Sequence, residues 1–152
     1  MARLEVPVQL RWGDLDAYQH VNNAAMLQLL EEARIEAFWV HPDEPQPRYP
    51  TAVLEGGTGS ALATFVAKQE IEYLAPLAYR RRPVIVELWL GHLGGASIEV
   101  CYEIKDEQVY ARAATTIVLV EAASGRPMRI GDLQRKAWEP YVEEPLEFRR
   151  RR

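Results

Sequence analysis

The sequence predicts an α+β fold, in which an antiparallel sheet of five strands is covered by one long helix. Three patterns predict it: an alternating segment near the N-terminus, one long helical stripe, and four further alternating runs joined by short turns. Strands that follow one another through short turns pair antiparallel, and such a sheet leaves a face that one amphipathic helix can cover.

The first alternating segment spans residues 3–12. A half-buried strand places every second side chain on its apolar side, and this pattern is met by Leu4, Val6, Val8, Leu10 and Trp12. A polar stretch, residues 13–23, follows this segment and leads into the helix.

The helix is predicted over about residues 23–40, because apolar side chains recur there every three or four residues. This stripe consists of Met26, Leu29, Leu30, Ala33, Ala37 and Val40. Asn22 or Asn23 can cap the first turn, since an amide oxygen accepts hydrogen bonds from unpaired backbone N–H groups. Pro42 predicts the end of the helix, because proline cannot continue its hydrogen-bond ladder.

Residues 42–60 contain four prolines and three glycines, which predicts a loop. Apolar positions alternate beyond it, and four strands are predicted in the runs 67–73, 84–90, 98–104 and 109–119. Gly94-Gly95 marks the turn after the second of these strands, and residues 105–107 mark the turn after the third. Some outward-facing positions, Trp89, Tyr110 and 118–120, are also apolar, which predicts a homodimer or homotetramer.

The chain has 152 residues, which predicts a single domain over 1–152, with a core of about 3–135 and a C-terminal tail of 136–152. Its net charge of −4 argues against a nucleic-acid partner. With neither a signal sequence nor a membrane span in the sequence, we expect a cytoplasmic protein. Arg149–Arg152 are expected to form a solvated tail, and the single cysteine, Cys101, a buried sheet residue.

Residues 11–23, Arg-Trp-Gly-Asp-Leu-Asp-Ala-Tyr-Gln-His-Val-Asn-Asn, place two carboxylates and a histidine in the loop before a helix. The first backbone N–H groups of a helix are unpaired, and the helix dipole adds partial positive charge there. A carbonyl oxygen that becomes an oxyanion would be stabilised at this point. A nearby carboxylate can activate water or attack the carbonyl itself, so the loop predicts acyl chemistry.

Residues 14–23 of this motif resemble the signature of the 4-hydroxybenzoyl-CoA thioesterase-like hotdog proteins, particularly the bacterial long-chain acyl-CoA thioesterases. They are also similar to a segment of the plant acyl-ACP thioesterases. Residues 70–77 and 126–130 resemble two further family segments, so the resemblance covers about residues 5–135. It implies a hotdog fold, five strands wrapped around a central helix, and a dimer with active sites between subunits. The implied reaction is hydrolysis of acyl-CoA to a free acid and CoA.

The resemblance also assigns roles. Asp16 matches the family's catalytic carboxylate, which acts as general base or as nucleophile, and His20 matches the histidine of the plant enzymes. Tyr18 stands where the plant enzymes carry asparagine, which favours the acyl-CoA branch and leaves Tyr18 as a substrate contact. The backbone N–H of Asn23 is the expected oxyanion donor, and Asn22 is either the cap or a second polar contact.

The rest of the substrate needs its own contacts. Met26 is expected to line the acyl pocket. Arg80, Arg81 and Arg82 either bind the CoA phosphates or form a solvated turn. Ser97, beside the glycine turn, either contacts pantetheine or belongs to an ordinary polar hairpin. No metal is expected, because the three histidines lie in unrelated segments, and no cofactor is expected, because CoA is part of the substrate.

Other assignments remain open for these residues. Asp14 fits a loop-stabilising role, and Glu31 and Glu32 fit a solvated helix face or a pair with Arg34. Two alternative functions are hydrolysis of acyl chains on acyl carrier protein and a non-catalytic acyl-CoA-binding module. The arginines could dock an acidic carrier protein. A hotdog dehydratase is disfavoured, because the histidine-phenylalanine-proline pattern expected there is missing from the sequence.

Overall fold

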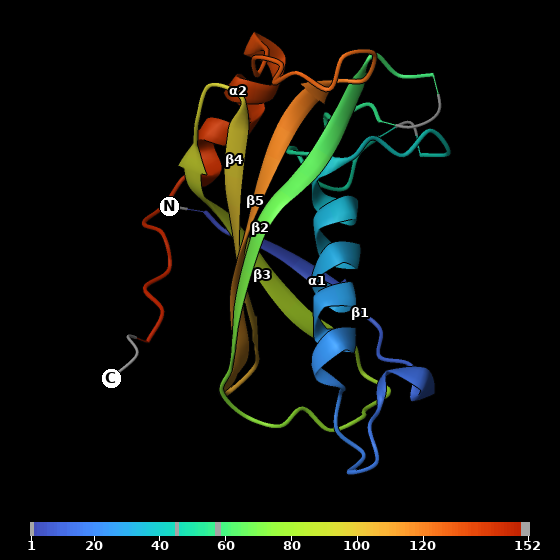
Figure 1. Ribbon diagram of the computed structural model, residues 1–152. Coiled ribbons are helices and arrows are strands. Elements are labelled where there is room, and N and C mark those ends of the chain that lie inside the picture. The colour runs from blue at the N-terminus through green and yellow to red at the C-terminus, as the bar shows by residue number, and fades with distance from the viewer. Residues whose placement is uncertain (1, 45, 57–58, 150–152) are drawn as a thin grey trace.

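A computed structural model of the chain describes residues 2–44, 46–56 and 59–149 (Figure 1). In this part of the chain, five strands form one antiparallel sheet with the order β1-β3-β4-β5-β2. The elements are β1 (Leu4–Val8), η1 (Trp12–Asp14), α1 (Asn23–Phe38), β2 (Leu62–Tyr73), β3 (Val84–Leu93), β4 (Ser97–Lys105), β5 (Val109–Glu121), α2 (Asp132–Trp138) and η2 (Glu139–Tyr141). The predicted α+β arrangement is confirmed, and no described helix is long and apolar enough to cross a membrane.

Helix α1 lies against one face of the sheet and buries the predicted stripe from Met26 to Ala37 (Figure 1). Its cap is Asn22, whose Oδ1 accepts a hydrogen bond from the Ala24 N–H at 2.8 Å. The helix ends at Phe38, before the predicted stop at Pro42, because Trp39 adopts an extended conformation. The Val40 N–H then donates to the Leu54 carbonyl at 2.8 Å, so Val40 leaves the stripe and is exposed.

Two predicted strands differ most from the observed ones: β1 at its C-terminal end and β2 at its N-terminal end. β1 stops at Val8, and Trp12 lies exposed in η1 instead of facing the core. The chain turns there because the buried Asp14 carboxylate accepts the Arg11 N–H at 2.8 Å. β2 starts at Leu62, earlier than the predicted run, and its pairing with β5 shifts register between Val66 and Lys68. Such a shift interrupts alternation, so the sequence pattern reveals only the second half of the strand.

The C-terminal end of α1 is closed by a buried cluster. Thr51 donates its hydroxyl to the Ala37 carbonyl at 2.6 Å, which satisfies one of the last carbonyls of the helix. The Trp138 indole N–H donates to the Thr51 carbonyl at 3.0 Å, and its ring meets Phe38 edge to face. Trp138 is 0% exposed, so the packed core extends past residue 135, where the sequence predicted its end.

The outer face of the sheet is covered by the chain's own C-terminal segment, residues 142–149, which we call the strap. The Trp89 indole N–H donates to the Glu144 carbonyl at 3.0 Å, and Leu146 and Phe148 pack on the cluster formed by Trp89, Cys101 and Ala114. Arg3 holds the start of the strap through an ion pair with Glu143 at 2.8 Å. It also places its guanidinium 3.7 Å from the centre of the Trp89 ring.

The strap corrects the prediction of what covers Trp89 and bounds the predicted tail. Trp89 points outward as predicted, yet its cover is the strap rather than a partner subunit. The predicted solvated tail starts at Arg149, whose backbone N–H donates to Glu72 Oε2 at 2.8 Å, while residues 150–152 lie outside the described residues. Gly91 leaves room for the strap, because a Cβ there would meet the Pro145 Cα at 3.1 Å, closer than most such contacts. Cys101 is buried beneath the strap as predicted, and burial raises the pKa of its thiol to about 11.

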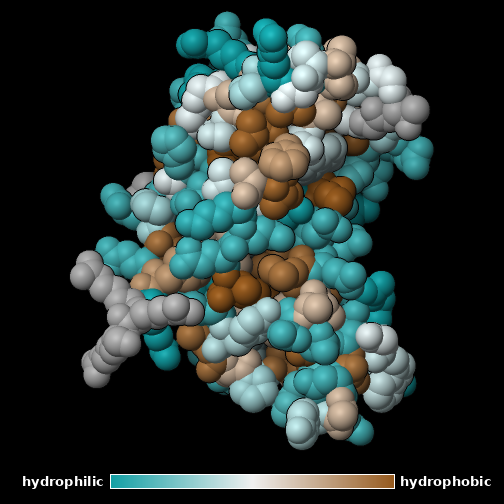
Figure 2. Space-filling view, in the orientation of Figure 1, coloured by the Kyte–Doolittle hydropathy of each residue, from teal (hydrophilic) through white to brown (hydrophobic). Residues whose placement is uncertain are grey.

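β2 is the least covered strand of the sheet. It lies at one edge, and most of its residues are exposed, including Phe65 at 61% and Tyr73 at 46%. In Figure 1, β2 (green) lies in front of the neighbouring strands. Figure 2 shows the molecule from the same side, with apolar patches among hydrophilic side chains. An exposed apolar edge of this kind is typical of a surface that another chain covers.

Candidate active site

The loop before α1 holds the Asp16 carboxylate in one position. Asp16 Oδ1 accepts hydrogen bonds from the backbone N–H groups of Tyr18 at 2.8 Å and His20 at 3.2 Å. The loop closes on itself, because the Asp16 N–H donates to the His20 carbonyl at 2.8 Å and Gln19 takes a left-handed conformation with φ of 63°. An aspartate that accepts from the residue two positions ahead forms an Asx turn, so one oxygen is used for structure.

The other oxygen and the start of the helix remain available for chemistry. Asp16 Oδ2 accepts no hydrogen bond from any described residue, and the Asn23 N–H donates to none. The Asn22 side chain forms the helix cap, one of the two roles predicted for it. A free carboxylate oxygen therefore lies in the loop that leads into unpaired helix N–H groups, where partial positive charge favours a developing anion.

A cleft of about 400 Å³ joins these groups. One side is formed by Asp16, His20, Asn23 and Met26, and the other by the end of β2 and the segment after it, Tyr73 to Leu77. The Tyr73 hydroxyl donates to the Asn23 carbonyl at 2.7 Å, which ties β2 to the first turn of α1. The structure thus brings together four of the residues that the sequence predicted for the site, with apolar side chains beside them.

The remaining predicted residues lie outside this cleft. Tyr18 is 81% exposed at the tip of the loop. Arg80 pairs with Asp106 at 2.7 Å, and this ion pair lowers the pKa of Asp106 to about 2. Arg81 and Arg82 are exposed, and in the described part of the chain neither forms an ion pair. Ser97 lies at the start of β4 and is separated from Tyr73 by the length of the sheet, because it pairs with Val118 in the far half of β5.

Other carboxylates near the motif have structural contacts. Asp14 is 2% exposed, and its Oδ1 accepts from the Arg11 guanidinium at 2.8 Å, so its role in stabilising the loop is confirmed. Glu31 lies 3.5 Å from Arg34 and is exposed, as expected for a solvated helix face. Among the described residues, no group of three or more histidine, cysteine or acidic side chains could hold a metal ion.

Sequence reasoning missed three aromatic residues at this end of the molecule. Tyr73 was expected only as a strand residue, although its position just before Leu-Ala-Pro-Leu marks a strand that ends. Trp12 and Tyr79 stack with ring centres 4.7 Å apart and an interplanar angle of 14°. The signal that could have placed Trp12 outside the strand is Gly13, which interrupts the alternation directly after it.

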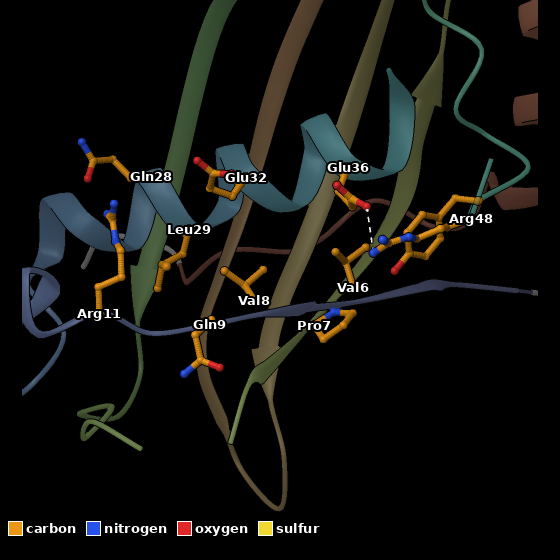
Figure 3. Close-up of a pocket in the computed structure, with 11 residues that line it drawn as sticks. Val6, Pro7, Val8, Gln9, Arg11, Gln28, Leu29, Glu32, Glu36 and Arg48 are labelled. Atoms are coloured by element: carbon orange, nitrogen blue, oxygen red, sulfur yellow. Dashed lines mark ion pairs between the residues drawn. The ribbon is translucent and has the colours of Figure 1, made fainter. Parts of the chain in front are cut away.

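A second groove of about 440 Å³ lies between β1 and the outer side of α1 (Figure 3). Its lining includes Gln9, Glu32 and the ion pair of Glu36 with Arg48 at 3.5 Å. None of Asp16, His20 and Asn23 lines it. The groove has polar side chains but no candidate nucleophile beside unpaired N–H groups, so we place the candidate active site in the cleft at Asp16.

Residues 10–138 match the family model described as the thioesterase-like superfamily. The fold matches a predicted thioesterase from Bacillus stearothermophilus with a TM-score of 0.75 and 23% identity, covering 95% of this chain and 99% of that one. A probable thioesterase from Escherichia coli gives a TM-score of 0.67 and 26% identity, over 91% and 98% of the two chains. These matches confirm the predicted hotdog fold.

One similar structure also contains a ligand. A thioesterase from Thermus thermophilus was crystallised with coenzyme A and zinc, and it matches with a TM-score of 0.67 and 26% identity. The match covers 93% of this chain and 96% of that one. The comparison with curated proteins gives no match.

Proposed function

Because the chain belongs to the thioesterase-like superfamily, we propose that it hydrolyses acyl-CoA at the cleft beside Asp16. The observation that carries this proposal is that the two oxygens of the Asp16 carboxylate have different contacts. One oxygen is held by two backbone N–H groups, while the other is left for chemistry. A fixed carboxylate with one available oxygen, close to unpaired helix N–H groups, has the parts that thioester hydrolysis needs.

In the proposed reaction, the thioester carbonyl oxygen lies at the N-terminus of α1 and accepts a hydrogen bond from the Asn23 N–H. In one route, Asp16 Oδ2 removes a proton from water, whose oxygen attacks the carbonyl carbon. In the other, Oδ2 attacks that carbon itself, and water afterwards hydrolyses the resulting mixed anhydride, which releases the acid and regenerates the Asp16 carboxylate. Negative charge that develops on the carbonyl oxygen is stabilised by the helix N–H groups and dipole. The C–S bond then breaks, and CoA leaves as its thiolate and takes up a proton. His20, whose N–H binds the Asp16 carboxylate, positions this group.

The acyl group is proposed to lie along the apolar part of the cleft, against Met26 and Leu77. The CoA part would extend away from the cleft toward solvent. The Thermus thermophilus relative, crystallised with coenzyme A, supports CoA as the carrier.

We also propose that the protein forms a homo-oligomer through β2. Phe65 and Tyr73 are exposed on this edge strand, and Tyr73 borders the cleft. A second copy that paired along β2 would therefore cover both the apolar edge and one side of the site. Light scattering at micromolar concentration should give a mass of at least twice 17.4 kDa, and a monomer would contradict the shared site.

Which thiol carries the acyl group of the substrate can be tested directly. Release of free thiol should be measured with one acyl group attached to CoA, to pantetheine and to acyl carrier protein, and then with short, long, branched and aromatic acyl-CoA. We expect the highest kcat/KM with CoA. Faster turnover on the carrier protein would favour the acyl-ACP alternative, and binding of acyl-CoA without thiol release would favour the non-catalytic module.

A further inference from the structure

Trp12 is an exposed aromatic residue next to the candidate site. It is 71% exposed, whereas Trp89 and Trp138 are buried at 1% and 0%. Tyr79 stacks on it with ring centres 4.7 Å apart, which covers one part of the indole and leaves the rest open to solvent. A large flat aromatic surface left in water can stack with a planar ligand.

Both rings are held firmly beside the motif loop. Trp12 starts η1, whose turn is fixed by the buried Asp14, and the Leu15 N–H donates to the Trp12 carbonyl at 3.2 Å. Tyr79 follows Ala78, which forms a β-bridge with His20. The aromatic pair and the Asp16 carboxylate therefore belong to one cluster of loops, and a ligand could reach both.

Positive charge follows the pair closely along the chain. Arg81 and Arg82 follow Tyr79 along the chain, and the Gln9 side-chain amide fixes this segment by donating to the Arg81 carbonyl at 2.8 Å. Both arginines are exposed, and neither forms an ion pair within the described residues, whereas Arg80 is held by Asp106. Two guanidinium groups are thus available for an anion, in place of the three that the sequence predicted.

A flat aromatic surface beside two such arginines matches a purine nucleotide, whose ring stacks and whose phosphates accept bidentate hydrogen bonds. We propose that Trp12 and Tyr79, with Arg81 and Arg82, bind the nucleotide end of CoA, the adenine ring stacking on the exposed face of Trp12. This inference rests on the proposed function and deepens it, because it explains how the enzyme would distinguish CoA from shorter thiol carriers.

The direct test is titration of the protein with 3′-phospho-ADP, the nucleotide half of CoA, followed by tryptophan fluorescence. Trp12 is the most exposed of the described tryptophans, so stacking should quench its emission, and Trp12→Ala should abolish that change. Leu133→Ala is the matched control, since Leu133 is 68% exposed on α2, and it should behave as wild type. Quenching that persists in Trp12→Ala, or no binding by wild type, would overturn the proposal.

The kinetic test compares two thioesters of the same acyl group. Trp12→Ala should raise KM for acyl-CoA at least about fivefold, the lower limit for losing one base–aromatic stack, and leave KM for acyl-pantetheine unchanged. Trp12→Phe keeps a flat ring and should restore most of the affinity. If Trp12→Ala raised KM equally for acyl-CoA and acyl-pantetheine, or raised KM only for substrates on acyl carrier protein, the result would contradict a nucleotide site. The 3′-phospho-ADP titration tests the nucleotide site even if the protein hydrolyses no thioester. If Trp12→Ala left acyl-CoA hydrolysis unchanged, the nucleotide site would be wrong and the proposed function would still hold.

Discussion

At its N-terminal end, α1 begins beside an open cleft, whereas at its C-terminal end it stops beneath a buried cluster. The first turn leaves the Asn23 N–H without a partner among the described residues. The last turn has its carbonyls paired, since Ala37 accepts from Thr51 and Phe38 accepts from the Leu54 N–H at 2.9 Å. One helix therefore presents unpaired groups for a ligand at one end and satisfies its groups internally at the other.

The two ends of α1 are therefore expected to respond differently to substitution. Substitutions at the closed end should lower the free energy of unfolding and leave the chemistry of folded molecules unchanged. Substitutions at the open end should change the unfolding free energy less and should mainly affect binding and turnover, because we propose that the groups there act on the substrate.

The largest expected effect is at the closed end. Trp138→Ala should lower the free energy of unfolding by about 3–5 kcal/mol, because it removes a fully buried aromatic ring and its hydrogen bond to Thr51. Urea denaturation measures this change. Leu133→Ala, at an exposed position on the same helix, is the control and should have little effect. A loss of kcat per folded molecule in Trp138→Ala would show that the two ends are coupled.

The next effect is at the open end. Asp16→Asn should lower kcat at least about 100-fold, because an amide can still accept the Tyr18 and His20 hydrogen bonds but cannot act as base or nucleophile. The melting temperature should stay near that of wild type. Asp43→Asn, an exposed position in the loop after α1, is the matched control. Turnover close to wild type in Asp16→Asn would contradict the mechanism and make Glu31 and Glu32 the next candidates.

A smaller loss of stability is expected from Thr51→Val. Valine has nearly the same shape, but it leaves the buried Ala37 carbonyl unpaired, which costs about 1–3 kcal/mol. Thr51→Ser keeps the hydroxyl and should lose less. If serine and valine were equally destabilising in thermal unfolding, the hydrogen bond would not be the stabilising feature of this end.

At the open end, Asn22→Ala should cost about 1 kcal/mol, since it removes the cap that binds the Ala24 N–H. Asn22→Asp keeps an acceptor at this position and should retain most of the stability. Calorimetry of the three proteins gives the comparison, and an unchanged midpoint in Asn22→Ala would mean that the loop replaces the cap.

The smallest effect concerns Asp106, whose ion pair with Arg80 lies on the same side of the molecule as the motif loop. Its pKa is lowered from about 3.8 to about 2, so the ion pair stabilises the folded state above pH 4. This contribution should disappear as pH falls from about 4 to about 2, because the carboxylate becomes protonated in the folded state too. The difference in unfolding midpoint between wild type and Asp106→Asn should shrink over that interval. A difference that stayed constant with pH would show that protonation of Asp106 does not change the stability of the fold.

Local sequence patterns predicted what depends on neighbours along the chain. The stripe from Met26 to Ala37, the Asn22 cap and four strands of alternating residues were all visible, because period and capping chemistry are local properties. They could not reveal the strap, since the contact of Trp89 with residue 144 joins distant segments. The first half of β2 was not predicted for a related reason. The register shift at Val66 interrupts the alternation, and only the pairing with β5, a distant segment, shows that these residues belong to the strand.

The candidate site was predictable to a similar extent. The motif placed Asp16, His20, Asn23 and Met26 in one neighbourhood because they are close in sequence, and the structure places them around one cleft. The opposite wall, formed around Tyr73, comes from a strand far along the chain, and no local pattern assigns it to Asn23. Ser97 lies outside this cleft, because the hairpin that contains it is at the other end of the sheet, and its contact with pantetheine stays a prediction.

The strap also has a consequence for biosynthesis. A chain is made from its N-terminus, so residues 142–149 leave the ribosome after every described strand and after all residues of the candidate site. Until then Trp89 and Cys101 lack their cover, and the outer face of the sheet exposes an apolar surface. A message truncated just after the codon for Tyr141 would encode all the proposed catalytic residues and still yield a product prone to aggregate.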